Sequence, residues 1–212
     1  MRYKITIEYD GTSLLGWQEQ LDGPSVQDYL QRALSCFTPV NDTDTCSLNN
    51  KEKSEEDFPI QELYEEAGTG RRLQKTDKII VSGAGRTDAG VHATAQVAHF
   101  DLKEDLVDWK LREAINARLR EMEAPVSVIA VEKVGNDFHA RFSARGRGYL
   151  YRILNRRAPA VLEKNRVWWV PVPLDVEKMR EGAGYLIGHH DFSSFRAAAC
   201  QAKSPVKTRD RL

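Results

Sequence analysis

The chain has 212 residues, of which 41% are hydrophobic and 29% are charged, so it can bury a sizeable core as one large domain or two small ones. Lys and Arg together number 31, as do Asp and Glu, and the formal net charge is therefore zero. No apolar run reaches the length of a membrane span, and the N-terminal MRYKITIEYD is not a signal peptide. The three cysteines are widely spaced and form no C-x-x-C pair, which argues against a zinc site or a disulfide framework. We therefore expect a cytoplasmic protein without a membrane segment.

The zero net charge hides an asymmetry along the chain. Residues 138–212 contain 15 Lys and Arg against 6 Asp and Glu, whereas the residues before them contain 16 against 25. A basic region of this kind is typical of a protein with a polyanionic partner, although an ordinary solvated surface gives the same count.

The first half reads as strands and helices in alternation. Residues 2–9 alternate apolar and polar side chains, which predicts a half-buried strand with Tyr3, Ile5, Ile7 and Tyr9 on one face. Helical spacing predicts a helix capped by Ser25 and a second helix over 108–119 capped by Asp108. Further strands are expected in three segments: residues 78–85, 96–102 and 124–134.

Residues 41–77 differ in texture from the rest of the first half. They are polar, charged and poor in large apolar side chains, so they cannot bury enough surface to offset the entropy of ordering. We predict a mostly disordered insertion there, within an N-terminal α+β domain that spans residues 1–136.

The second half, residues 137–212, is expected to form a C-terminal α+β domain. Strands are predicted over 149–154 and 166–171, and a helix is predicted after a capping Asp175. The mixture of strands and helices in both halves predicts an α+β fold with largely antiparallel sheets.

One loop carries a charged pair inside a frame of glycines. The stretch GAGRTDAG, residues 83–90, follows a predicted strand and places Arg86 and Asp88 between Gly85 and Gly90. The carboxylate of Asp88 could be a nucleophile or a base, and Arg86 could hold it ionised or grip a phosphate. The alternative is a tight turn in which Asp88 caps its own amides. The loop matches neither glycine-rich nucleotide signature, so nucleotide binding is not expected.

A second candidate lies on the basic strand. Tyr149 and Tyr151 share a face and are flanked by three arginines, Arg145, Arg147 and Arg152. Aromatic rings stack on bases while guanidinium groups meet phosphates, so this pattern indicates contact with RNA. The alternative is that both tyrosines are half-buried sheet residues. His189 and His190 are adjacent, but neighbouring side chains point apart in any regular structure, and the other three histidines are separate, so we expect no metal site.

Several motifs in one order make the sequence recognisable. It resembles the TruA family of tRNA pseudouridine synthases in the stretches YDGT, GWQ, GPSVQ, GAGRTDAGVHA, QVAHF, FHARFSA, YLYRI and HDFSSFR, which together span nearly the whole chain. The resemblance implies an isomerase that converts uridine to pseudouridine in the tRNA anticodon stem-loop, without metal or organic cofactor, as a homodimer. It implies two RRM-like halves with a basic cleft between them.

The same resemblance assigns roles to residues of this chain. The family's catalytic aspartate falls on Asp88, the arginine that helps displace the target base falls on Arg86, and the tyrosine that stacks on the uracil falls on Tyr149. Asp88 would attack the sugar covalently or assist its deprotonation, and the sequence leaves both routes open. A non-catalytic RNA-binding module derived from the family is the alternative function.

Three departures from the family pattern carry expectations of their own. They are the insertion at 41–77, Gly148 directly before Tyr149, and an end at KTRDRL where the resemblance implies further strands and a helix. We expect a C-terminally truncated member whose second half is incomplete and whose activity is below that of a longer version.

Overall fold

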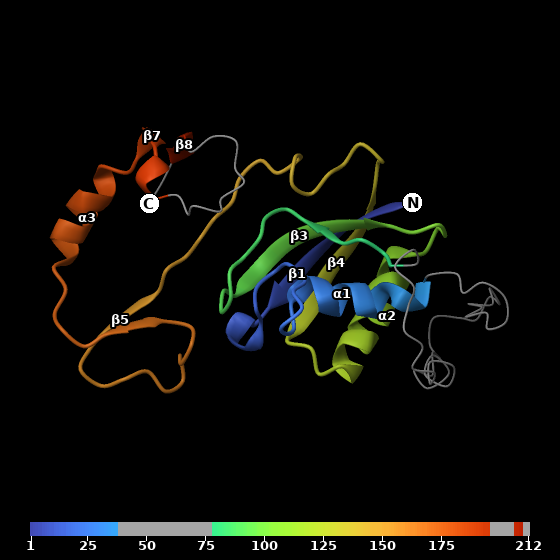
Figure 1. The fold of residues 1–212 in the computed structure, drawn as a ribbon, viewed down its shortest axis with the longest axis horizontal. Helices are drawn as coiled ribbons and strands as arrows, with labels where there is room; N and C mark the ends of the chain where they lie inside the picture. Colours follow the sequence, from blue (N-terminus) through green and yellow to red (C-terminus); the bar gives the residue numbers. More distant parts are fainter. Residues whose placement is uncertain (38–77, 196–205, 210–212) are drawn as a thin grey trace. The chain divides into compact units, whose positions relative to one another are not determined.

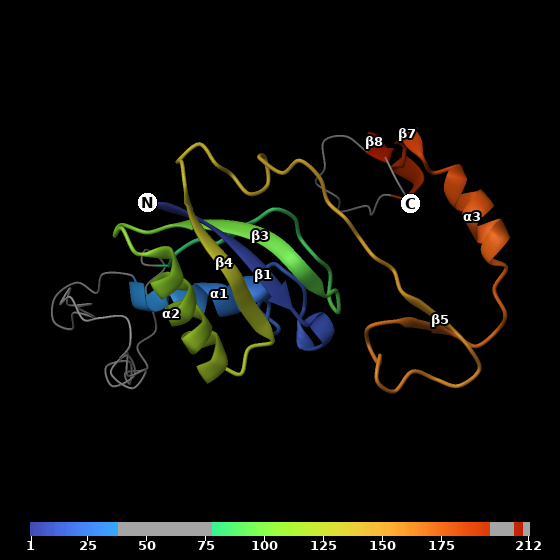
Figure 2. The same ribbon diagram turned by 180° about the vertical axis from the view of Figure 1, so that it is seen from behind.

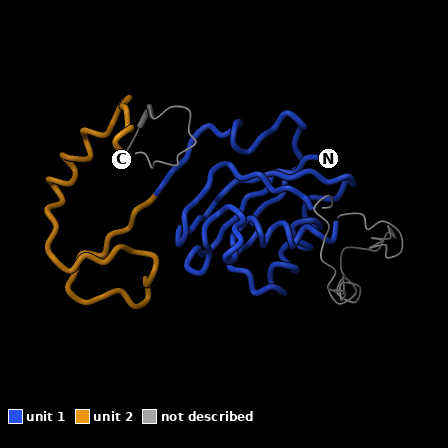
Figure 3. The backbone as a smooth tube through the Cα atoms, viewed as in Figure 1, with its two compact units in different colours: residues 1–149 blue, residues 150–212 orange. Residues whose placement is uncertain are grey.

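The computed structural model describes residues 1–37, 78–195 and the backbone of 206–209. These fall into two compact units, residues 1–149 and residues 150–212 (Figure 3). The disordered insertion expected at 41–77 lies outside the described residues, and the domain boundary expected at residue 136 stays a prediction.

Unit 1 is built on a four-stranded antiparallel sheet (Figure 1). In the strand order β2-β3-β1-β4, the members are β2 (Ser82–Gly83), β3 (Ala93–Asp101), β1 (Arg2–Tyr9) and β4 (Val126–Val134). The alternation expected in β1 is confirmed, since Tyr3, Ile5 and Ile7 are fully buried and Tyr9 is nearly so. Their shared face is the floor of the hydrophobic core.

Two helices cover that face and lie side by side (Figures 1 and 2). Helix α1 (Val26–Leu34) begins where the Ser25 hydroxyl accepts a hydrogen bond from the Asp28 amide at 3.1 Å, as the sequence predicts. Helix α2 (Asp108–Glu121) buries Leu111, Ile115 and Leu119 against the sheet, which is the expected face. Each of these buried side chains contributes about 1.5–3 kcal/mol.

The cap predicted for α2 is wrong. Asp108 is the first residue inside the helix, and the N-cap is Val107, whose side chain makes no capping bond. The Asp108 carboxylate instead accepts a hydrogen bond from the Lys133 amide of β4 at 3.3 Å. A tertiary partner has therefore replaced the local one.

Unit 2 contains two small sheets and a helix. Strands β5 (Ile153–Asn155) and β6 (Trp168–Val170) are parallel, and β7 (Gly188–Asp191) pairs with β8 (Val206–Arg209) in an antiparallel ladder. Helix α3 (Val176–Gly184) has the expected cap, because Asp175 accepts a hydrogen bond from the Lys178 amide at 3.0 Å. The described residues also include three short 3-10 helices: η1 (Gly11–Ser13), η2 (Ser35–Phe37) and η4 (Ser193–Phe195).

The strand expected over 149–154 begins only at Ile153. The ladder runs from the Ile153–Trp168 pair to the Asn155–Val170 pair, and residues 149–152 belong to no strand. A run of apolar and aromatic side chains therefore does not suffice for a strand, which also needs a partner.

The α+β class and the antiparallel four-stranded sheet are confirmed. The two RRM-like halves and the basic cleft stay predictions. No helix in the described ranges has the length and apolar character required to cross a membrane.

Candidate active site

The glycine loop joins β2 to β3 and presents its two charged residues at the surface. Arg86 and Asp88 are both exposed, and Gly90 takes the positive φ of 79° that closes the turn into β3. The Val91 amide donates to the Asp88 carbonyl oxygen at 3.3 Å across this turn. The backbone bend that the glycines predict is therefore present, with Asp88 at its outer side.

A turn from the N-terminal part of the chain holds this loop by backbone atoms. The Trp17 amide donates to the Thr87 carbonyl oxygen at 2.9 Å, and the Gly90 amide donates to the Leu14 carbonyl oxygen at 3.3 Å. Gly16, with a φ of 105°, lies so near that a Cβ there would stand 2.5 Å from the Thr87 carbonyl oxygen. Only glycine fits at this point, and this explains why the GWQ stretch begins with Gly16.

The turn that ends β1 holds the far side of the loop. The Gly11 amide donates to His92 Nδ1 at 3.2 Å, and a Cβ on Gly11 would overlap the Val91 carbonyl group. The YDG turn and the glycine loop are therefore packed backbone to backbone.

Two side chains from the central strands reach the loop from beneath. The Tyr9 hydroxyl and the Thr87 Oγ1 are 2.9 Å apart and share a hydrogen bond, and Gln96 Nε2 donates to the Gly85 carbonyl oxygen at 2.8 Å. Burial raises the pKa of the Tyr9 phenol, and hydrogen bonding by Thr87 and Gln96 opposes this only in part. Tyr9 therefore remains a neutral hydroxyl at physiological pH.

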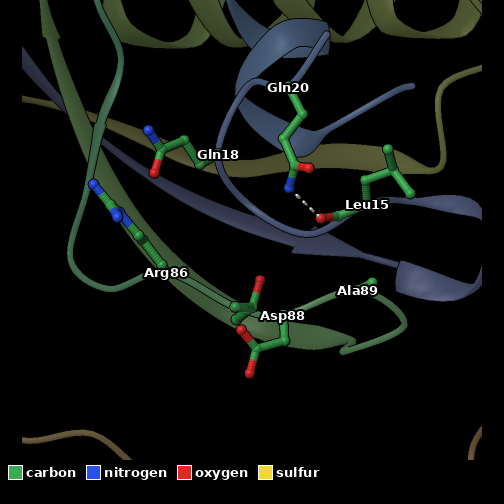
Figure 4. Close-up of a pocket in the computed structure, with 7 residues that line it drawn as sticks. Leu15, Gln18, Gln20, Arg86, Asp88 and Ala89 are labelled. Carbon is green, nitrogen blue, oxygen red and sulfur yellow. Dashed lines mark hydrogen bonds between the residues drawn. The ribbon is translucent and has the colours of Figure 1, made fainter. Parts of the chain in front are cut away.

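A pocket of about 350 Å³ opens between the N-terminal turn, residues 14–20, and the glycine loop (Figure 4). This volume is at the lower end of the range for small-molecule sites. Its walls come from the N-terminal turn and the glycine loop, and they consist of Leu15, Gln18, Gln20, Arg86, Thr87, Asp88 and Ala89. Gln20 Nε2 donates to the Leu15 carbonyl oxygen at 3.0 Å, which ties this wall together.

The charged pair is not an ion pair. Figure 4 shows the guanidinium of Arg86 and the carboxylate of Asp88 directed away from each other, and none of the ion pairs among the described residues joins them. Arg86 is therefore not the counter-ion of Asp88 in this structure.

The structure brings two further predicted site residues to the loop. Arg147 Nη2 donates to the Ala84 carbonyl oxygen at 2.7 Å, and its Nε would lie 3.4 Å from a Cβ on Gly85. Tyr149 is 63% exposed and lies near enough to Tyr9 to influence its titration. Arg147 thus binds the backbone of the glycine loop two residues before Arg86, a contact that the sequence did not indicate.

The fifth predicted residue is described within its own unit. Arg152 belongs to unit 2, where its Nη1 is 2.5 Å from the Glu163 carboxylate. Within the described part of the chain, no group of three or more His, Cys, Asp or Glu side chains is arranged to hold a metal ion.

The residues that sequence reasoning missed are those that hold the loop. Tyr9 was expected only as a core residue and Gln96 only as part of a strand. Neither shows a local signal, because each acts through a contact with a segment distant in sequence.

The proteins that this chain resembles in sequence are tRNA pseudouridine synthases. A model of the tRNA pseudouridine synthase family matches residues 5–143, which include the whole glycine loop and the turns that hold it. The chain is 48% identical over 213 aligned residues to tRNA pseudouridine synthase A of Paramagnetospirillum magneticum, and 46% identical over 211 to that of Brucella ovis. These alignments cover 100% of this chain and 67% and 69% of the two relatives. The chain therefore belongs to the tRNA pseudouridine synthase family.

Proposed function

We propose that this pseudouridine synthase isomerises uridine in the anticodon stem-loop of tRNA, with Asp88 as the catalytic carboxylate. One observation carries the proposal. Asp88 is an exposed acid beside a pocket of about 350 Å³, on a loop that other backbone segments hold from both sides. A fixed loop with an accessible carboxylate suits an acid that must meet one atom of a large substrate.

The reaction is a rearrangement within one nucleotide. The N1–C1′ glycosidic bond breaks, the uracil turns, and a C5–C1′ bond forms. The proton on C5 is lost and N1 gains one, so the product is an isomer of the substrate. A stacked or paired uridine cannot turn in this way, so it must first leave the stack at a cost of a few kcal/mol.

Asp88 starts the reaction at the sugar, as a nucleophile toward C1′ or as the base that removes a sugar proton. Both routes require the carboxylate to be ionised and within hydrogen-bonding distance of the ribose. Its exposed position on the outer side of the bend allows that approach.

The neighbouring residues supply the contacts with the RNA. Arg86 is directed away from Asp88 and is exposed, which suits a guanidinium that meets a phosphate or fills the space left by the flipped base. Tyr149 offers an exposed ring on which the uracil can stack. Arg147 and Arg152 add positive charge along the RNA backbone, and a homodimer remains part of the proposal.

The test is release of tritium from tRNA that carries [5-³H]uridine, with tRNA binding measured in parallel. We expect Asp88→Asn to abolish release while tRNA still binds. Asp137→Asn, an exposed acid beside Arg2 at the opposite end of β1, is the matched control and should release tritium at the parental rate.

Two results would overturn the proposal. One is release by the Asp88→Asn chain at the parental rate. The other is binding of tRNA by the parental chain without any release, which would favour the RNA-binding module.

A further inference from the structure

We infer that Tyr9 and Gln96 are positioning residues, which set the geometry of the Arg86–Asp88 segment from beneath without touching the RNA. This inference rests on the proposed function, because it takes Asp88 as the group whose placement matters.

Thr87 is the link between Tyr9 and the two charged residues, since it stands between them in the chain. Its side chain shares a 2.9 Å hydrogen bond with the Tyr9 hydroxyl, and its carbonyl oxygen accepts from the Trp17 amide at 2.9 Å. The residue is thus held at both its side chain and its backbone, and the directions of Arg86 and Asp88 follow from its orientation.

Gln96 fixes the chain on the other side of Arg86. Its amide donates to the Gly85 carbonyl oxygen at 2.8 Å, and its backbone pairs with Ile7 in the β1–β3 ladder. Tyr9 and Gln96 therefore tie the loop to the two central strands of the sheet, the most rigid support that unit 1 offers.

Burial separates this role from RNA binding. Tyr9 is only 5% exposed, and its ring packs against that of Trp17 at a centroid distance of 6.5 Å. Loss of its hydroxyl leaves the surface that meets the tRNA unchanged. The predicted effect is therefore a fall in kcat that exceeds any rise in KM, because a misplaced Asp88 costs turnover whereas a misplaced Arg86 costs affinity.

The chain contains a matched control on the same strand and the same face. Tyr3 is fully buried, and its hydroxyl donates to the Leu106 carbonyl oxygen at 3.1 Å and accepts from the Leu106 amide at 2.7 Å. Tyr3→Phe removes at least as many hydrogen bonds as Tyr9→Phe, but it does so at the far end of β1 from the loop.

The experiment compares Tyr9→Phe, Gln96→Leu, Thr87→Val and Tyr3→Phe in the full chain. We expect the first three to lower kcat about tenfold or more with a smaller change in KM, and Tyr3→Phe to leave kcat unchanged. The double variant Tyr9→Phe, Thr87→Val should be no slower than the slower single variant, because the two changes remove one shared bond. Thr87→Ser keeps the hydroxyl and should lose less than Thr87→Val.

Amide hydrogen exchange provides a readout that does not depend on activity. Tyr9→Phe should speed exchange at residues 84–92 and at Trp17, whose amide is bound to Thr87, whereas Tyr3→Phe should not. Equal exchange in the two variants, or equal kcat, would overturn the inference. The outcome for Asp88→Asn tests the proposed function separately.

Discussion

Gly16 lies against Thr87 at a distance that leaves no room for a side chain. A Cβ at Gly16 would stand 2.5 Å from the Thr87 carbonyl oxygen and 3.2 Å from the Asp88 carbonyl carbon, and the φ of 105° disfavours any other residue. The N-terminal turn and the glycine loop are therefore fitted to each other at the level of the main chain.

This contact predicts a graded series of glycine substitutions. Gly16→Ala combines backbone strain with a clash, Gly90→Ala at φ 79° adds strain in open space, and Gly146→Ala adds neither. Strain alone costs about 1–3 kcal/mol, so we expect the loss of stability to increase from Gly146 through Gly90 to Gly16. Urea denaturation measures it, and equal stability of the Gly16 and Gly90 variants would contradict the clash.

Arg147 is predicted to hold the glycine loop in position through its hydrogen bond, in addition to supplying positive charge. Its Nη2 donates to the Ala84 carbonyl oxygen at 2.7 Å, a contact that the guanidinium makes while packed beside Gly85. Arg147→Lys keeps the charge but replaces the planar fork, so tRNA affinity should change less than about twofold while kcat falls severalfold. Arg145→Lys is the matched control and should change neither quantity. A loss of affinity with an unchanged kcat in Arg147→Lys would contradict this and assign the residue to RNA binding alone.

Tyr149 is predicted to contribute through its ring. It is 63% exposed next to the loop, so its face is accessible to a base. If stacking contributes about 1–3 kcal/mol, Tyr149→Leu should lower kcat/KM by roughly 5–150-fold, whereas Tyr149→Phe should retain most of it. Tyr151→Leu, at a residue that is 89% exposed, serves for comparison. Equal losses at the two positions would remove the special role of Tyr149.

His99 is predicted to make the stability of unit 1 depend on pH. Its ring is buried, and Nδ1 accepts a hydrogen bond from the Ala140 amide at 3.2 Å, while His139, Arg2 and Asp101 lie nearby. Burial, and then the charges of His139 and Arg2, lower the pKa of His99 below its usual value, although Asp101 opposes them.

The sign of the effect follows from this direction. As the pH falls through about 6.5, the unfolded chain takes up a proton on this residue before the folded chain does, so stability is lost by up to about 1.4 kcal/mol per pH unit. Urea denaturation at several pH values between 7.5 and 5.5 should show this loss for the parental chain and a smaller one for His99→Gln. Identical slopes would rule out His99 as the source.

The sequence predicts best where structure is local. The buried face of β1, the Ser25 cap of α1 and the Asp175 cap of α3 all follow from patterns of a few residues, and all are confirmed. Asp108 fails as a cap because the amide of Lys133, which lies beyond the next turn, binds its carboxylate.

In the candidate site, too, the sequence predicts local features but misses contacts between distant segments. Glycines and charges mark Arg86 and Asp88 directly in the sequence, but the bonds that give them direction come from Tyr9, Trp17 and Gln96. These partners lie in other elements, and only the paired strands bring them together. The resemblance to the family names the residues, while their support is visible only in three dimensions.

The way the loop is held has a consequence for folding. The contacts of Thr87 with Tyr9 and Trp17 close long stretches of chain, so the entropy of closure must be met before they form. We therefore expect the loop to acquire its shape only after β1 and β3 have paired. During refolding, the recovery of turnover should lag behind the recovery of helical signal.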